Sequence, residues 1–261
     1  MAIPSRQIGW GTEENLLWQI SKQLERLTQV VGQIGQTTTT TTTAVPTTTT
    51  TTTAVPGNVD ILASTDFDIT GDFTIEMFVN LSNLDGFPRP YSFGAYPAPN
   101  AISIEGGELY FWANNTTLIN GTFVPSTGIW YHLCVIGSGS TAYMFIDGNL
   151  VASSPYGGSI SSDGLPLTIG YGNEPNSYFN GQISNFKWSD AVEYSTGGFG
   201  VPTVPLTADG NTVLLIFQGT DLASQLTDNS GNGHDATNAG ATYSINNPFI
   251  GYEGSLQMGV L

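Results

Sequence analysis

The stretch that decides the fold is WYHLCVIGSGSTAYMFIDGNLV, which covers residues 130–151. Aromatic and β-branched residues dominate both sides of its GSGS turn, and such side chains favour strands because they pack well on a pleated surface. Asp147-Gly148 predicts a tight turn into a short third strand, since Gly tolerates the positive φ that such turns require. Three short antiparallel strands need a second sheet to cover their apolar face, and we expect most of residues 57–261 to supply that cover.

The same alternation recurs on both sides of this stretch. Phe73, Ile75, Met77 and Val79 are spaced at period two, which predicts a half-buried strand. Many short strands separated by Gly, Pro and Asn turns indicate an all-β, antiparallel two-sheet sandwich. Further strands are expected at 91–93, 102–104, 109–113, 118–119, 167–171, 181–188, 213–217 and 242–245. Five side chains are expected to point inward: Phe73, Trp130, Cys134, Ile146 and Ile183.

Three segments carry a resemblance to a known family. WYHLCVIGSGSTAYMFIDGNLVASS resembles the central signature of laminin-G-like jelly rolls, within the concanavalin A-like lectin/glucanase superfamily. FDITGDFTIEMFVN and LTIGYGNEPNSYFNGQISNFKWSDAVEY are similar to the same family. The resemblance covers residues 57 to about 250 and implies a jelly-roll sandwich, with a brief turn of helix at 191–194. A shared fold does not by itself imply a shared function.

The charge of the chain is strongly negative and unevenly distributed. The net charge is −16, from 21 acidic and 5 basic residues. Residues 1–36 contain as many basic as acidic residues, so the excess falls on residues 57–261, whose basic residues are Arg89 and Lys187. Such a surface repels phosphate backbones, which argues against nucleic acid as a partner. It is compatible with calcium or a basic partner, although solubility is the simpler explanation.

The sequence offers little for export or catalysis. It shows no signal peptide and no long apolar run, so we expect synthesis in a cytoplasm and no insertion into a bilayer. Cys134 is the only cysteine, which leaves no intramolecular disulfide and suggests a small core residue. A glycosidase needs two closely placed carboxylates, whereas Glu76 stands alone in its strand and Glu105 and Glu108 flank a Gly-Gly turn. We therefore do not expect an enzyme.

Residues 1–36 predict an anchor arm followed by an oligomerising helix. Thr12 is a good N-cap, and Glu13 and Glu14 follow it, where negative charge suits the helix dipole. A heptad seam without flanking charged pairs then favours more than two helices, with a trimer preferred, or a helix that lies in a groove of another protein. Packing on the chain's own domain is the alternative. The seam consists of Leu17, Ile20, Leu24, Leu27, Val31 and Ile34.

Residues 37–56 predict a stalk. They are two copies of a ten-residue unit, seven Thr followed by Ala-Val-Pro. β-Branched Thr disfavours a helix, and Pro46 and Pro56 exclude a continuous one. Without a large apolar residue the segment cannot form its own core. An ordered stalk and a disordered linker are both open, and either would separate the anchor from a head at 57–261.

A Gly-rich turn is the candidate calcium site. Asp228 and Asn232 bracket it in TDNSGNGHDATN, and oxygen side chains with free carbonyls are the ligands that calcium takes. The segment resembles a turn of laminin-G-like domains, some of which bind calcium near it. Asp66 and Asp68 would be further ligands if the terminal strands pair. The alternative is a β-turn in which the Asp228 carboxylate bonds to the backbone two residues on.

Two loops carry the candidate carbohydrate-binding residues. Residues 85–100 and 170–181 are rich in Tyr, Asn and Pro, and sugars stack their C–H faces on aromatic rings beside polar groups. The alternative is that the rings pack on the sandwich and anchor the loops. The candidates are Arg89, Tyr91, Tyr96, Tyr171, Asn173, Asn176 and Tyr178.

The order of the parts indicates a function. A helix with a heptad seam, a Thr/Pro stalk and an acidic jelly-roll head resemble virion fibre or decoration proteins of bacteriophages, and IPSRQIGWGTEENLLWQISKQLERL is similar to anchor segments of phage structural proteins. The resemblance implies a protein on the virion surface, held by other virion proteins through its N-terminal segment, whose head binds a host-surface polysaccharide. A decorating head without a ligand and a non-viral cell-surface lectin module are the alternatives.

The uncharged heptad seam predicts that residues 1–36 drive association. Sedimentation of the full chain should give a species larger than a monomer, with a trimer favoured, and residues 57–261 should sediment as a monomer. A monomeric full chain, with no particle partner present to supply a groove, would count against the coiled coil.

Overall fold

The computed structural model describes residues 57–249 and 254–259. The predicted anchor, its heptad seam and the Thr-rich stalk lie outside the described residues, so they stay predictions. Within the described part of the chain, no helix is long and apolar enough to cross a membrane.

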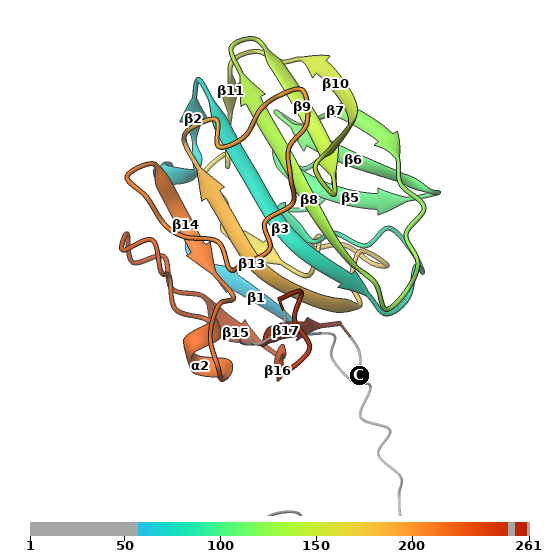
Figure 1. Ribbon diagram of the computed structural model, residues 1–261, viewed down its shortest axis with the longest axis vertical. Helices are drawn as coiled ribbons and strands as arrows, with labels where there is room; N and C mark the ends of the chain where they lie inside the picture. The colour runs from blue at the N-terminus through green and yellow to red at the C-terminus, as the bar shows by residue number, and fades with distance from the viewer. Residues whose placement is uncertain (1–56, 250–253, 260–261) are drawn as a thin grey trace, which may run out of the picture. The chain divides into compact units, whose positions relative to one another are not determined.

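Two antiparallel sheets form the domain, with almost no helix (Figure 1). The seven-stranded sheet has the order β15 (Thr237–Ala239), β1 (Asn58–Ile61), β12 (Leu167–Ile169), β4 (Tyr91–Phe93), β5 (Asn100–Glu105), β6 (Glu108–Ala113) and β7 (Thr116–Thr122). The eight-stranded sheet has the order β10 (Asn149–Pro155), β9 (Thr141–Ile146), β8 (Trp130–Ser138), β3 (Phe73–Leu81), β13 (Gly181–Ser189), β17 (Ser255–Met258) and β16 (Thr242–Ser244), and β14 (Thr212–Ile216) also pairs with β13. The smaller elements are the β2–β11 pair (Ile69–Thr70 with Ser159–Ile160), the 3-10 helix η1 (Thr65–Phe67) and the helix α2 (Leu222–Gln225).

The stretch at 130–151 forms the three strands that its sequence predicts. β8, β9 and β10 are consecutive neighbours in the eight-stranded sheet, and β3 pairs with the other side of β8. The turn after β9 has positive φ at Asp147 (48°) and Gly148 (71°). A Cβ at Gly148 would lie 2.0 Å from the backbone oxygen of Phe199, so this turn needs Gly for space as well as for φ. The other predicted strands are present too, which confirms the all-β sandwich.

The core lies between the two sheets. Phe73, Ile75, Met77 and Val79 of β3 are all 0% exposed and belong to this core, as their period-two spacing predicts. The prediction that this strand is half-buried was wrong, because its outer face is covered too and all nine of its residues are buried. On the facing sheet, the alternate residues of β4, β5, β6 and β12 enter the same core. Full burial of an aliphatic side chain of this size contributes about 1.5–3 kcal/mol, so the inter-sheet core is the main stabilising feature of the domain.

Two of the five side chains predicted to point inward, Cys134 and Trp130, lie on the outer face instead, whereas Phe73 and Ile183 are in the inter-sheet core and Ile146 packs against it. Cys134 is buried, but it packs with a separate cluster on the outer face of the eight-stranded sheet. Trp130 is partly buried against a second outer cluster, and Ile146 is partly buried at the margin of the core. The prediction failed because β8 is apolar on both faces, and alternation alone then does not tell the inner face from the outer one.

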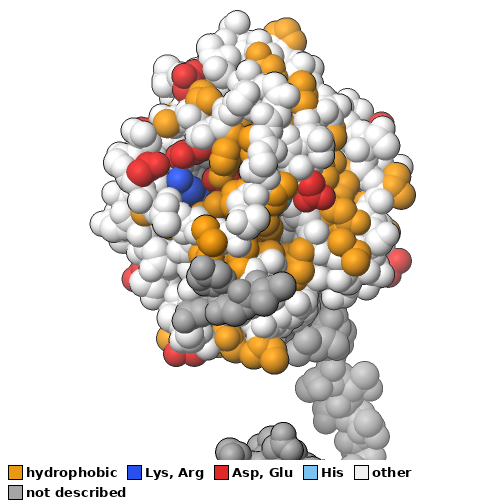
Figure 2. All heavy atoms as spheres, viewed as in Figure 1, with side chains coloured by type: hydrophobic (Ala, Val, Ile, Leu, Met, Phe, Trp, Pro, Cys, Tyr) orange, Lys and Arg blue, Asp and Glu red, His pale blue; other side chains and the backbone are white. Residues whose placement is uncertain are grey.

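The outer face of the eight-stranded sheet is covered by residues 190–211, called here the crossing segment. Figure 1 shows this orange segment running in front of β3 and β8 between β13 and β14. The helical turn expected at 191–194 is wrong, because the backbone there bonds to the sheet: the Thr74 hydroxyl donates to the carbonyl oxygen of Ala191 (2.7 Å) and accepts from the N–H of Glu193 (3.0 Å). Figure 2 shows apolar side chains gathered along the same face.

Ile183 and Ile146 provide a test of the observed register. Ile183→Ala should lower the free energy of unfolding by about 2–5 kcal/mol, because it leaves a cavity in the inter-sheet core. Ile146→Ala should cost less, since that side chain is already partly exposed, and Ile245→Ala, at a site that is 85% exposed, serves as the control. Urea unfolding measures all three. A larger loss for Ile146→Ala than for Ile183→Ala would contradict the register.

Candidate functional site

The two loops predicted to bind carbohydrate lie side by side. The N–H of Phe87 donates to the carbonyl oxygen of Asn176 (3.0 Å), and the N–H of Arg89 donates to that of Ser177 (3.2 Å). The Arg89 guanidinium reaches across and pairs with the Glu174 carboxylate at 2.5 Å. Residues 85–91 and 172–178 therefore form one continuous surface at the end of β4 and β12.

Two of the predicted binding residues, Arg89 and Tyr91, are buried and hold this surface together, whereas Asn173 and Asn176 are exposed. Tyr91 is 0% exposed and donates from its hydroxyl to Oδ1 of Asn100 (2.6 Å), and burial raises its pKa well above the ordinary value. Asn173 and Asn176 adopt positive φ in the turn (56° and 64°), and Asn173 donates to the Thr168 hydroxyl. Tyr91 is thus a core residue, and its ring face is closed to a ligand.

Tyr171 and Tyr178 stack on each other. Their ring centroids are 4.0 Å apart and their planes are 9° from parallel. One face of each ring is therefore already covered by the other ring. The pair is partly buried, as expected of rings that also anchor a loop.

Tyr96 is the exposed residue among the four tyrosine candidates. Its side chain is 59% exposed and packs edge-on against Trp112 of β6, with ring centroids 5.2 Å apart and planes at 83°. Tyr110 and Trp112 alternate along β6 with Leu109 and Phe111, which are in the inter-sheet core, so both aromatic rings lie on the outer face. Tyr96, Tyr110 and Trp112 together are called the aromatic patch below.

Polar groups border the aromatic patch. One oxygen of Glu108 accepts hydrogen bonds from the Tyr110 hydroxyl (2.6 Å) and from the side-chain amide of Asn120 on β7 (3.1 Å). These two bonds lower the pKa of Glu108, and the hydrogen bond to Glu108 in turn raises the pKa of Tyr110. Glu105 lies opposite Glu108 at the end of the β5–β6 hairpin. The patch therefore combines ring faces with fixed hydrogen-bond acceptors, which is the chemistry that saccharides require.

The aromatic patch lies at one end of a row of residues that crosses the outer face of the seven-stranded sheet. Asp60, Thr168, Ser92, Ala101 and Trp112 are successive cross-strand partners on β1, β12, β4, β5 and β6. The three central members are small and at most 2% exposed. The part of the face open to a ligand is consequently around β6 and β7.

Tyr110 and Trp112 were not identified from the sequence as candidate binding residues. The strand ELYFWA carries large residues at every position from Leu109 to Trp112, so its pattern does not reveal which rings are outside. The signal that could have identified them is the position of this strand in a sheet with one solvent-facing side, because such a strand exposes every second residue.

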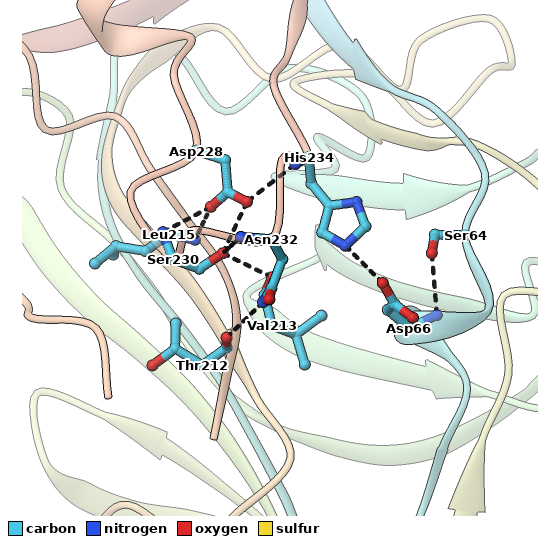
Figure 3. Close-up of polar contacts among 9 residues, drawn as sticks. All are labelled: Ser64, Asp66, Thr212, Val213, Leu215, Asp228, Ser230, Asn232 and His234. Carbon is cyan, nitrogen blue, oxygen red and sulfur yellow. Dashed lines mark hydrogen bonds and ion pairs between the residues drawn. The ribbon is translucent and has the colours of Figure 1, made fainter. Parts of the chain in front are cut away.

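The turn proposed for calcium is closed by its own hydrogen bonds (Figure 3). One carboxylate oxygen of Asp228 accepts from the N–H groups of Leu215 (3.1 Å) and Ser230 (2.9 Å). The other accepts from the Ser230 hydroxyl (2.7 Å) and from the N–H of His234 (3.0 Å). Asn232 donates to two carbonyl oxygens of β14. This arrangement is the alternative to a calcium site: a turn in which the Asp228 carboxylate accepts hydrogen bonds from the protein's own backbone.

The other two proposed calcium ligands are also engaged. Asp66 pairs with Nε2 of His234 at 2.9 Å, and one oxygen of Asp68 accepts from the N–H of Ser162 (2.6 Å). Both line a polar cavity of about 670 Å³ beside the turn. Within residues 57–249 and 254–259, no three His, Cys, Asp or Glu side chains are grouped so that they could share a metal ion.

Glu76 is buried on the outer face of the eight-stranded sheet. Its carboxylate accepts from the Tyr194 hydroxyl (2.8 Å) and lies 2.9 Å from Nε2 of His132. The Glu76 side chain is 1% exposed beneath the crossing segment. In this position it fixes the crossing segment to the sheet and does not face a surface that a polysaccharide could reach.

The chain belongs to the concanavalin A-like lectin/glucanases superfamily, whose family profile matches residues 53–193. No curated protein sequence matches the chain. Among solved structures, a protein of Bacteroides ovatus with a suggested carbohydrate-binding role has a similar fold, with a TM-score of 0.56 and 14% identity over 70% of this chain and 56% of that one. The chain thus spans little more than half the length of that protein.

Two further solved structures are similar over smaller parts of the chain. A heptameric pentraxin from Limulus polyphemus has a TM-score of 0.42 and 16% identity over 57% of this chain and 75% of that one. Domains LG4-5 of the mouse laminin α1 chain give a TM-score of 0.40 and 18% identity over 57% of this chain and 45% of that one. At these identities the similarities concern the fold alone.

Asp228 offers a test of the turn. Burial raises its pKa, but the hydrogen bonds from Ser230, His234 and Leu215 outweigh that effect and lower it overall. The stability that Asp228 contributes is therefore present above the ordinary Asp pKa of about 3.9 and is lost as the pH falls through the lower folded value. Asp228→Asn places an amide N–H₂ among these donors and should cost about 1–3 kcal/mol at pH 7.

Urea unfolding of the wild type and Asp228→Asn at pH 7 and pH 3 measures this contribution, with the exposed Asp85→Asn as the control. The difference between wild type and variant should shrink at pH 3. Calcium should not raise the melting temperature of the wild type. A calcium-induced rise that Asp228→Asn abolishes would show instead that the carboxylate is a metal ligand.

Proposed function

We propose that residues 57–261 form a carbohydrate-binding head, which holds a host-surface saccharide on the aromatic patch without hydrolysing it. The observation that carries the proposal is the exposed Tyr96 ring set edge-on against Trp112, on the strand that also carries the Glu108 carboxylate, whose position is fixed by hydrogen bonds from Tyr110 and Asn120. Ring faces pack against the C–H groups of a sugar, and neighbouring acceptors select for its hydroxyl groups. Membership of a superfamily named for lectins supports the same class of ligand.

The head would act on a virion. The sequence of residues 1–36, with its heptad seam, and the Thr-rich residues 37–56 suit an anchor and a spacer of a bacteriophage fibre or decoration protein, made in the host cytoplasm and exposed on the particle. Saccharides offer little apolar area, so each site would bind weakly. Several heads on one particle would raise the avidity without any new contact. A decorating head that binds no ligand and a cell-surface lectin module are the competing functions.

Substitutions in the patch test the site. Tyr96→Ala and Trp112→Ala should each reduce binding of the full chain to its ligand on a glycan array by about three- to tenfold, because an aromatic contact contributes about 0.5–1.5 kcal/mol and each variant removes one ring of the patch. Tyr178→Ala is the matched control, since it removes a loop Tyr outside the patch and should retain most of the binding.

Adsorption of the particle to host cells tests whether the head serves in host adhesion. Loss of adsorption in Tyr96→Ala, with a melting temperature within a few degrees of the wild type, would support adhesion through the patch. Equal infection by particles that lack the protein, together with an array on which the wild type binds nothing, would leave the decorative function in place of the adhesive one.

A further inference from the structure

A cavity of about 400 Å³ lies where the crossing segment meets β3 and β8, on the outer face of the eight-stranded sheet. This volume is within the range of small-molecule sites, which are mostly apolar and carry a few fixed polar groups. The carbohydrate-binding function proposed above does not use the cavity, because the aromatic patch lies on the seven-stranded sheet. The apolar side chains that line the cavity are Phe78, Trp130, Val201, Pro202, Pro248 and Phe249.

The aromatic rings of the cavity are held in place by their neighbours. The Phe78 ring lies 4.9 Å from that of Phe249 and 4.6 Å from the imidazole of His132, measured between centroids. The Trp130 indole donates to Oδ1 of Asn246 (3.3 Å), which fixes the third ring. Rings that are already ordered lose little conformational entropy when a ligand arrives, so the cavity is prepared for one.

Asp147 supplies a fixed carboxylate beside these rings. It is exposed at the turn after β9 and also lines the cavity. One of its oxygens accepts from the N–H of His132 (2.8 Å), and its own N–H donates to the carbonyl oxygen of His132 (2.9 Å). Its other oxygen has no hydrogen-bond partner among the described residues. The cavity therefore has a negatively charged acceptor that is held in position and still open to a donor.

Among the described residues, no positive charge offsets Asp147 in the cavity. The lining includes neither Lys nor Arg. The imidazole of His132 lies 2.9 Å from Glu76, so this pair has no net positive charge at neutral pH, whether or not the imidazole is protonated. Arg89 and Lys187, the two basic side chains of the head, are buried and paired with acids elsewhere. A cation is therefore attracted both by the cavity and by the net charge of the head.

We propose that this cavity binds a small organic ammonium ion, with its ammonium group at the free oxygen of Asp147 and its apolar body against the three rings. The inference is independent of the carbohydrate-binding function. An ammonium N–H forms a charge-assisted hydrogen bond to a carboxylate, and nearby aromatic rings attract the same cation. The apolar body gains further affinity by leaving water. A neutral ligand of the same shape keeps the apolar contribution and loses the ionic one.

Three ligands of nearly equal size and different charge test the proposal. Isothermal titration of the full chain compares phenethylamine, phenethyl alcohol and phenylacetate, which share a phenyl ring and differ in the polar end. Phenethylamine should bind most tightly, and the alcohol about tenfold more weakly, because its neutral hydroxyl forms a weaker bond to the carboxylate. Phenylacetate should bind most weakly of the three, since its charge has the same sign as that of Asp147.

Asp147→Asn tests the carboxylate. The amide keeps an oxygen for the N–H of His132, and Asn tolerates the positive φ of this turn, so the fold should survive. The affinity for phenethylamine should fall about tenfold and approach that for the alcohol. Asp85→Asn is the matched control, since it removes the same charge from an exposed loop that does not line the cavity, and it should bind phenethylamine like the wild type.

Thr203→Trp tests the position of the site independently of charge. Thr203 is exposed and lines the cavity, so a large side chain there can enter it without disturbing the core. The variant should bind phenethylamine about tenfold or more weakly, because the indole takes the place of the ligand. Val204→Trp, at a residue that is 51% exposed and outside the lining, should retain the binding. The melting temperature of each variant shows whether a loss of binding comes from unfolding.

The outcomes are separate from those of the carbohydrate-binding function. Weaker binding of the amine in Asp147→Asn and Thr203→Trp, with both controls unchanged, would support the ammonium site even if the wild type binds nothing on a glycan array. Equal affinity for the amine and the alcohol would overturn the ammonium assignment. Failure of the wild type to bind any of the three ligands, or amine binding that Thr203→Trp leaves intact, would overturn the site itself.

Discussion

The packing of Trp188 between the sheets is the interaction on which the rest of the head depends. Trp188 projects from β13 of the eight-stranded sheet and meets Tyr91 and Phe93 of β4 in the facing sheet, with ring centroids 5.9 Å and 5.8 Å away. Phe67 of η1 completes the cluster at 5.7 Å. Arg89 lies two residues before this short strand and Tyr96 three residues after it, so the aromatic cluster that joins the sheets also fixes both ends of the candidate site.

The two sheets use their outer faces differently. The crossing segment covers the eight-stranded sheet and is held there by polar contacts, with Tyr194 bonded to Glu76 and Lys187 3.1 Å from Glu193. Groups buried in this way are costly to separate from their partners, so the segment has a defined position and leaves little of that face to a ligand. Among the described residues, the outward-facing side chains of β6 and β7 in the seven-stranded sheet are half-buried or exposed, and the rings among them are the ones that a ligand can reach.

The sequence predicted the architecture because β3 alternates apolar with mostly polar residues, although the crossing segment also buries its outer face. β8 is apolar on both faces, which is why Cys134 and Trp130 were assigned to the wrong side. β1, β15 and β17 were not predicted, since each is 3 or 4 residues long and exists through partners distant in the chain.

The candidate site was predictable only in part, again because short strands give no readable pattern. The loop composition identified Arg89 and Tyr96, but Tyr91 in the same run is a core residue, and a three-residue strand is too short for a pattern to show it. Asp228 illustrates a second limit. A carboxylate beside a Gly-rich turn has the same sequence whether it binds a cation or its own backbone, and only the positions of the donor N–H groups of Leu215, Ser230 and His234 distinguish the two.

The charge of the head determines what kind of binding it can support. Its two basic side chains, Arg89 and Lys187, are 3% and 5% exposed and both are paired with acids, so the surface presented to a partner is negative. Such a field slows the approach of an anionic cell surface and gives no long-range attraction to a neutral one. Attraction must then come from contact alone, from ring stacking and hydrogen bonds over a small area, which is weak for a single head. A projecting, multivalent arrangement of the kind that residues 1–56 predict is the physical means by which a head of this charge would hold a surface firmly.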